Sequence, residues 1–217
     1  MRIFVLACAF IIASFPLLSQ EDSTSTSKLN WGVTAGLYMA HTSIEKFEGF
    51  NNLVTDNYEV DSKMGYGVSG GFVVAYHISP KWLVKPYLRA ALSSAEVQHK
   101  FSTEPVHNHQ VYPLVAELGA LVERELGNGN YRPCVLFGGN ISYDIALYEG
   151  AELELKPLDF MAQLGVGVKK KSVHSTWSID LILSIGLRQL ALSEGSIYNQ
   201  STGKVSRNNL GIYFYFY

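Results

Sequence analysis

Apolar residues alternate with small or polar residues through nearly the whole chain after residue 28. Because successive side chains of a strand point to opposite faces, a period of two predicts β-strands. We expect the fold class to be all-β. The pattern occurs in eight segments, residues 30–40, 65–78, 82–92, 111–123, 131–145, 158–169, 177–188 and 209–217.

The connections between these segments alternate in length. The long and polar ones are residues 43–64, 96–109, 147–156 and 189–205, and the short ones are residues 79–81, 125–130 and 170–175. Pro80 and the "GNGN" stretch supply residues that tight turns favour. Eight strands joined in this way predict an up-and-down antiparallel barrel with one elaborated end, the asymmetry of transmembrane barrels.

Alternation alone does not say which face of the strands is buried, and a soluble lipocalin-type barrel also has eight strands. Here the polar face consists mostly of Gly, Ser and Ala, which suit a narrow lumen filled by side chains. Charged residues make up only 17% of the chain, below the roughly 25% typical of soluble domains. The sequence therefore favours an eight-stranded transmembrane barrel, with a soluble barrel or sandwich as the alternative.

Aromatic residues lie near the ends of the predicted strands, as the interfacial girdles of membrane barrels require. We expect eight of them to form such girdles: Trp31, Tyr66, Tyr76, Trp82, Tyr112, Tyr131, Tyr143 and Trp177.

The N-terminus has the pattern of a cleavable secretory signal. Arg2 gives a positive start, and an apolar run follows from Ile3 to Leu18. An N-terminal transmembrane anchor is the alternative, although the run is shorter than the roughly 20 residues that a helical span needs. We expect a signal peptide at residues 1–20, a polar segment at 21–28 and the barrel at 29–217.

The signal, the "NWGVTAGL" and "GYGVSGGF" strands and the aromatic terminus resemble the PorT-type outer-membrane β-barrel family of Gram-negative bacteria, and more distantly the OmpX and OmpA barrels. The resemblance implies an eight-stranded barrel in the cell outer membrane and a link to protein secretion. It also implies that Phe214, Phe216 and Tyr217 form the signal that the barrel-assembly machinery recognises. The alternation turns Phe216 outward, whereas the resemblance turns Tyr217 outward, and a one-residue slip separates the two registers.

Charged side chains on the small-residue face must point into the lumen, because facing lipid would cost each of them up to about 2–4 kcal/mol. Arg89 and Glu117 should meet near mid-height, and pairing inside would plug the barrel. A narrow polar path for ions is the alternative. The expected lumen network is Lys85, Arg89, Glu117, Glu123, Arg132, Asp144, Asp159, Gln163, Asp180 and Arg188.

Motifs with catalytic or metal-binding chemistry are weak. The stretch "GVSGG" at 67–71 matches a hydrolase elbow, but that motif needs a following helix, and Ser69 lies within a strand. His41 and Ser43 are the rim pair that a lipid-modifying enzyme would use. His99, His107 and His109 could bind a transition metal, although a solvated loop is favoured. We expect no cofactor and no metal.

The leading hypothesis is a non-enzymatic outer-membrane barrel with a mostly plugged lumen that contacts partners through its loops. Its surroundings would be outer-membrane lipids, and the apolar residues of loop 43–64 would offer a contact surface for a protein. A narrow channel and a lipid-modifying enzyme are the second and third hypotheses. Nucleic acid is excluded as a partner, because the net charge is −2 and no basic field exists.

Overall fold

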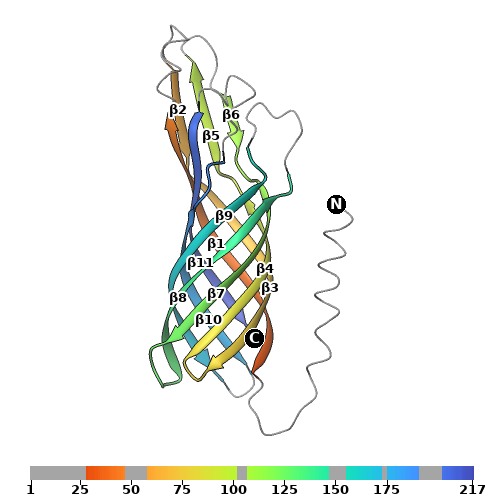
Figure 1. Ribbon diagram of the computed structural model, residues 1–217, viewed down its shortest axis with the longest axis vertical. Coiled ribbons are helices and arrows are strands. Elements are labelled where there is room, and N and C mark those ends of the chain that lie inside the picture. The colour runs from red at the N-terminus through yellow and green to blue at the C-terminus, as the bar shows by residue number, and fades with distance from the viewer. Residues whose placement is uncertain (1–27, 47–57, 102–106, 147–154, 173–174, 191–201) are drawn as a thin grey trace.

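The computed structural model describes residues 28–46, 58–101, 107–146, 155–172, 175–190 and 202–217 (Figure 1). Every helix or strand element in these ranges is a strand. The strands are β1 (Leu29–Lys46), β2 (Tyr58–Lys63), β3 (Gly65–Ser79), β4 (Trp82–Ser93), β5 (Glu96–Phe101), β6 (His107–Gln110), β7 (Leu114–Glu125), β8 (Tyr131–Asp144), β9 (Leu158–Lys171), β10 (Thr176–Gly186) and β11 (Thr202–Phe216).

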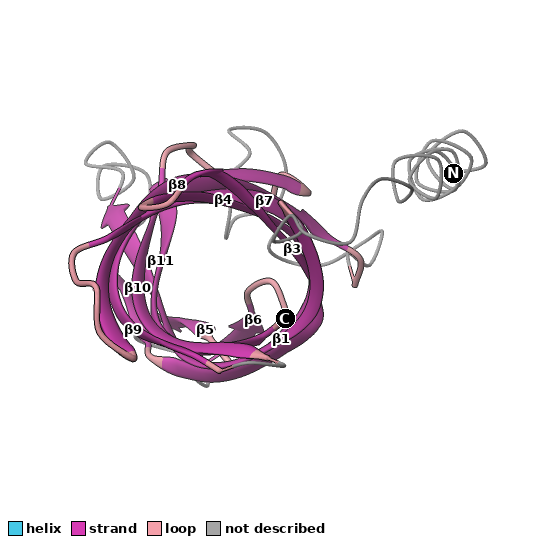
Figure 2. Ribbon diagram, turned by 90° about the horizontal axis from the view of Figure 1, so that it is seen from below, coloured by secondary structure: helices cyan, strands magenta, loops and turns pink. Residues whose placement is uncertain are grey.

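Eight of these strands form a closed antiparallel barrel in the order β1-β11-β10-β9-β8-β7-β4-β3. The ring closes because β1 pairs with both β3 and β11, so the first and last strands are neighbours. Figure 2 shows the closed ring from below. The predicted all-β fold and up-and-down topology are confirmed. We call the end with the short β3–β4, β7–β8 and β9–β10 connections the turn end and the opposite end the loop end.

The barrel wall is apolar on its outer side. On β1, Leu37 is 62% exposed while its neighbour Tyr38 is 7% exposed, and the same alternation continues along the other barrel strands. Large exposed side chains include Phe72, Leu164 and Phe216. Most charged side chains of the barrel strands lie inside instead. This inside-out distribution is the opposite of that in a soluble barrel, whose apolar face fills the interior.

Three further strands form a small sheet in the order β2-β5-β6, which we call the outer sheet. It projects beyond the loop end of the barrel (Figure 1). The predicted loops 43–64 and 96–109 are therefore wrong over part of their length. Residues 43–46 belong to β1, residues 58–63 form β2, and β5 and β6 lie within 96–109.

The outer sheet continues the barrel wall. Glu96 of β5 pairs with Gln110 of β6, and Leu92 of β4 pairs with Leu114 of β7. The two pairs are four residues apart on both chain segments, so the β5–β6 pairing keeps the register of the β4–β7 pairing. Between β2–β5 and β3–β4, residues 64–66 oppose only residues 94–95, which makes a β-bulge.

Tyr112 lies between β6 and β7 and has a backbone φ of 53°, unusual for a residue other than glycine. The prediction that Tyr112 belongs to the lipid-facing girdle is wrong, because its side chain is 1% exposed. The left-handed residue interrupts the alternation, and the Tyr112 hydroxyl donates a hydrogen bond to the backbone oxygen of Lys156.

The register of the last strand follows the alternation. Tyr213 and Tyr215 are buried inside the barrel, whereas Ile212 and Phe216 are exposed outside. Tyr217 packs against the inner apolar cluster of the barrel instead of pointing outward. No slip therefore separates the terminus of β11 from the rest of the strand.

In the described part of the chain, no helix is long and apolar enough to cross a membrane.

Candidate functional site

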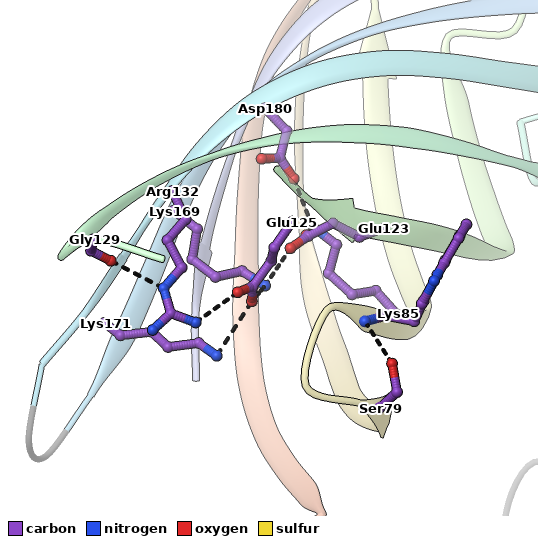
Figure 3. Close-up of polar contacts among 10 residues, drawn as sticks. Ser79, Lys85, Glu123, Glu125, Gly129, Arg132, Lys169, Lys171 and Asp180 are labelled. Carbon is purple, nitrogen blue, oxygen red and sulfur yellow. Dashed lines mark hydrogen bonds and ion pairs between the residues drawn. The ribbon is translucent and has the colours of Figure 1, made fainter. Parts of the chain in front are cut away.

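Four fully buried charged side chains meet inside the barrel toward the turn end (Figure 3). The Lys85 Nζ lies 2.7 Å from Glu123 Oε2 and 2.6 Å from Asp180 Oδ2. Lys169 forms a second ion pair with Glu123. Lys85 is on β4, Glu123 on β7, Lys169 on β9 and Asp180 on β10. The Lys85–Glu123 pair joins neighbouring strands, whereas the Lys85–Asp180 and Lys169–Glu123 pairs join strands that are not neighbours in the wall.

The cluster extends to the rim of the turn end through Glu125. Its carboxylate lies 3.1 Å from Lys169 Nζ, 3.2 Å from Lys171 Nζ and 2.7 Å from an Arg132 Nη1. Arg132 also donates from Nε to the backbone oxygen of Gly129 in the β7–β8 turn. We call the whole set, Lys85, Glu123, Glu125, Arg132, Lys169, Lys171 and Asp180, the turn-end cluster.

At mid-height, the Arg89 guanidinium lies 3.1 Å from Glu117 Oε2. The two residues are direct partners on β4 and β7, as their predicted meeting requires. The Arg89 guanidinium carbon is also 4.0 Å from the ring centre of Tyr87 and 4.4 Å from that of Tyr213. A cation between two rings is favourable where water is excluded.

Two hydrogen bonds between uncharged side chains lie beside this pair. The Tyr87 hydroxyl donates to Gln163 Oε1 at 2.7 Å, and Gln163 Nε2 donates to Ser184 Oγ at 3.1 Å. These three residues come from β4, β9 and β10. Side chains thus bridge the lumen at this level as well.

Closer to the loop end, Arg207 on β11 is a buried cation that the expected lumen network did not include. An Arg207 Nη2 donates to Ser142 Oγ at 2.9 Å, and Nε lies 3.6 Å from Asp159 Oδ2. The guanidinium carbon is 4.7 Å from the ring centre of Tyr112. Arg188 is only half-buried and donates to the backbone oxygen of Leu158.

An apolar layer lies above Arg207 at the mouth of the barrel. It joins inward side chains of the outer sheet, Val60 and Val97, to Val111 and Val205 and to residues of the loop-end connections. The members of this cluster, which we call the cap, are Tyr38, Ala40, Val60, Ala91, Ala95, Val97, Val111, Tyr112, Val115, Leu155, Leu190 and Val205. The cap covers the lumen with side chains that do not attract ions.

The structure places eight of the ten expected lumen residues in buried positions, Lys85, Arg89, Glu117, Glu123, Asp144, Asp159, Gln163 and Asp180, and leaves Arg132 and Arg188 half-buried. Asp144 accepts a hydrogen bond from the backbone of Ala146. Sequence reasoning missed Glu125, Lys169, Lys171 and Arg207. Lys169 and Arg207 occupy positions whose side chains point inward by the alternation of their strands. The alternation could therefore have identified these two residues as lumen residues.

The expected girdle residues other than Tyr112 lie on the outer wall. Tyr66 and Tyr143 are exposed near the loop end. The other five are near the turn end: Trp31, Tyr76, Trp82 and Tyr131 are exposed, and Trp177 is half-buried. Tyr131 and Trp177 contact each other edge to face, with ring centres 6.5 Å apart. Of the expected assembly signal, Phe216 is exposed, while Phe214 and Tyr217 are half-buried.

The residues weighed for catalysis and metal binding lie apart from the lumen. His41 and Ser43 are exposed on β1, two residues apart, and Ser69 is within β3. His99 and His107 are partners in the outer sheet, and the His99 and His109 ring centres are 5.1 Å apart. Among the described residues, no group of three or more His, Cys, Asp and Glu side chains is placed to hold a metal ion.

Acid should open the outer sheet through His99. This residue is fully buried, and burial together with the neighbouring His109 and His107 lowers its pKa from 6.5 to about 4. Between those values the unfolded segment binds more protons than the folded one, so the stability of the sheet falls as pH drops through this window. We expect the amides of β5 to lose hydrogen-exchange protection between about pH 6.5 and 4, and His99→Phe to remove this dependence. Equal pH dependence in both proteins would contradict the assignment.

No family model and no curated protein matches the sequence. Among solved structures, the chain is similar to the outer membrane protein OprG from Pseudomonas aeruginosa, with 12% identity and a TM-score of 0.44 over 88% of this chain and 97% of that one. It is similar to the transport unit of the autotransporter AIDA-I from Escherichia coli, with 7% identity and a TM-score of 0.32 over 92% and 93% of the chains. At these values the comparisons indicate nothing about ligand, activity or partner, and membership of the PorT-type family is not shown.

Proposed function

We propose that the protein is an integral outer-membrane β-barrel with a closed lumen, and that it works as a structural or interaction protein through its loop end. The observation that carries this proposal is the combination of an apolar outer wall with ion pairs that cross the lumen. The first feature suits a lipid environment, and the second closes the path through it. The proposed role involves no catalysis and no cofactor.

The outer wall supports the membrane location. The barrel strands have 11 to 18 residues, and a tilted membrane strand needs about 9–11. Basic side chains lie over girdle rings at the turn end, with Arg124 5.4 Å from the Trp82 ring centre and Lys170 5.3 Å from that of Tyr131. Such pairs suit the boundary between hydrocarbon and headgroups. Residues 1–20, proposed as a cleavable signal, lie outside the described residues. The assembly role proposed for the C-terminal aromatic residues rests on the PorT-type resemblance alone.

The filled lumen favours a plug over a channel. An eight-stranded barrel has an interior just wide enough for side chains to fill. Here Lys85 spans the interior between Glu123 and Asp180, Arg89 lies between two tyrosine rings, and the cap covers the mouth. An ion would have to break buried ion pairs and cross an apolar layer, and both steps are costly.

The loop end is the proposed contact surface. The outer sheet exposes charged side chains, including Glu59, Asp61, Lys63 and Lys100, and its weak pairs Lys63–Glu96 and Lys100–Glu59 are 3.9 and 3.7 Å long. A protein partner at residues 43–64 remains part of the proposal. Of the residues that suggested it, Phe47, Phe50, Leu53 and Val54 lie outside the described residues, and Tyr58 is the first residue of β2. A role in protein secretion rests on the PorT-type resemblance alone.

Conductance across planar bilayers separates the plug from the channel. We expect the purified protein to insert without steady single-channel steps, because the lumen is filled at three levels. Steps of constant size that change in Lys85→Met, but not in Lys63→Met, would support the channel hypothesis instead. The Lys63 variant is a matched control, since Lys63 is on the outer sheet with its side chain 63% exposed.

A further inference from the structure

A groove of about 720 Å³ crosses the outer wall of the barrel. One side of it is a row of outward side chains that are partners across five strands, Leu92, Val68, Leu37, Ile212 and Leu181. The other side is formed by Tyr66, Met39 and Leu210. These three are partners on β3, β1 and β11, two residues away from the first row. Two parallel rows of apolar side chains therefore enclose a linear trough.

The floor of the groove is a row of backbone. Gly67, Tyr38 and Gly211 are partners on β3, β1 and β11, and all three lie between the two rows. Side chains at the two glycines would point inward, where a Cβ on Gly67 would be 2.2 Å from the Tyr38 ring and one on Gly211 2.7 Å from the Tyr38 Cβ. The absence of these side chains lets the Tyr38 ring lie against the inside of the wall. Its hydroxyl donates to the Leu92 backbone oxygen at 2.9 Å and braces three strands.

The two ends of the groove differ in polarity. At the loop end it is lined by Ser93, Ser94 and Pro113, and Ser94 Oγ bonds to the backbone of Tyr66. At the other end it reaches Leu181 in the middle of β10. Barrel strands tilt by about 35–45°, so a row across them descends obliquely from the rim into the wall. The polar groups of the groove thus lie at its outer end alone.

We infer that this groove binds one acyl chain of a membrane lipid, with the ester and headgroup near Ser94 and the chain running toward Leu181. The Ser93 side chain has the inward parity of β4, and its Oγ accepts from the Ala95 backbone N–H, so Ser93 lines the groove without offering its hydroxyl. The inference rests on the proposed membrane location. The groove is continuous with the lipid-facing wall, so its occupant comes from the bilayer. A narrow apolar trough with one polar end matches a polymethylene chain attached to a polar head. Because the chain comes from an apolar bilayer, its binding rests on van der Waals packing in the trough and on the polar contacts of the head.

Photocrosslinking tests the site. The full-length barrel is reconstituted into phosphatidylcholine vesicles that contain a small fraction of phosphatidylcholine with a diazirine on one acyl chain, and labelled peptides are mapped by mass spectrometry. We expect peptides of β1, β3 and β11 to carry several-fold more label than those of β8 and β9, whose outward Phe137 and Leu164 lie on the wall away from this groove. Val68→Trp should fill the trough and reduce the label to the β8 level. Val166→Trp, at a position of similar exposure, should leave the label unchanged.

Each other outcome contradicts the inference in a distinct way. Equal labelling around the inserted barrel would mean that lipids only surround it, and would leave the proposed function standing. Crosslinks to a second copy of the chain, in place of lipid, would make the groove a protein interface. Absence of label with the protein left in the aqueous phase would overturn the proposed function together with the inference.

Discussion

Lys85→Met is expected to destabilise the barrel by about 3–5 kcal/mol, the typical effect of removing one partner from a buried ion pair. Lys85 forms an ion pair with Asp180 at 2.6 Å. It is also one of the two lysines that pair with Glu123, and all three side chains are fully buried. Methionine preserves most of the side-chain volume but none of the charge. Asp180 would then be a buried carboxylate without its cation.

Urea unfolding of the reconstituted barrel measures this effect. Lys63→Met is the matched control, because the Lys63 side chain is 63% exposed and its pair with Glu96 is 3.9 Å long. Pairs at the surface contribute at most about 1 kcal/mol. Lys85→Met combined with Asp180→Leu should recover part of the loss, since Glu123 still pairs with Lys169. If the Lys85 and Lys63 variants unfold at the same urea concentration, the turn-end cluster does not stabilise the barrel.

Glu117→Ala is expected to destabilise the barrel by a similar amount, about 3–5 kcal/mol, because it leaves a buried cation without its partner. The change would leave the Arg89 guanidinium buried between the Tyr87 and Tyr213 rings without its carboxylate. The rings attract the cation but do not neutralise it. Heat-modifiable gel mobility and urea unfolding are the measurements, with Glu59→Ala on the outer sheet as the exposed control.

A double-mutant cycle isolates the pair itself. Glu117→Leu combined with Arg89→Met removes both charges and should be more stable than either single variant, because no buried charge is left unpaired. Additive losses would mean that Arg89 and Glu117 do not interact in the folded barrel.

The wall of the barrel was predictable from sequence because its period of two is set by the strand backbone. The alternation placed Leu37 outside and Glu117 inside. At the terminus it indicated Phe216 outward while the resemblance indicated Tyr217 outward, and the structure follows the alternation. The neighbour pair Arg89–Glu117 was also predictable, since partners on adjacent strands follow from strand order and turn length. These features depend on local geometry alone.

Contacts across the lumen could not be derived in the same way. Lys85 and Asp180 are 95 positions apart on strands that are not neighbours, and their meeting depends on strand tilt and barrel curvature. The outer sheet was missed because its strands are short and one of their faces is charged, so β5 resembled a polar loop. Tyr112 was misplaced because its own left-handed backbone takes its side chain out of the alternation, while Val111 and Val115 on either side keep the inward parity, and the residue type gave no sign of it.

The location of the protein tests the central claim most directly. The full-length chain is expressed in a Gram-negative host, and membranes are separated from the periplasmic fraction and washed with alkaline carbonate, which removes peripheral proteins. The account predicts that the protein stays in the washed outer-membrane fraction and migrates as a compact form on gels until it is heated. Recovery in the soluble periplasmic fraction would contradict the account, because a barrel with an apolar outer wall requires lipid around it.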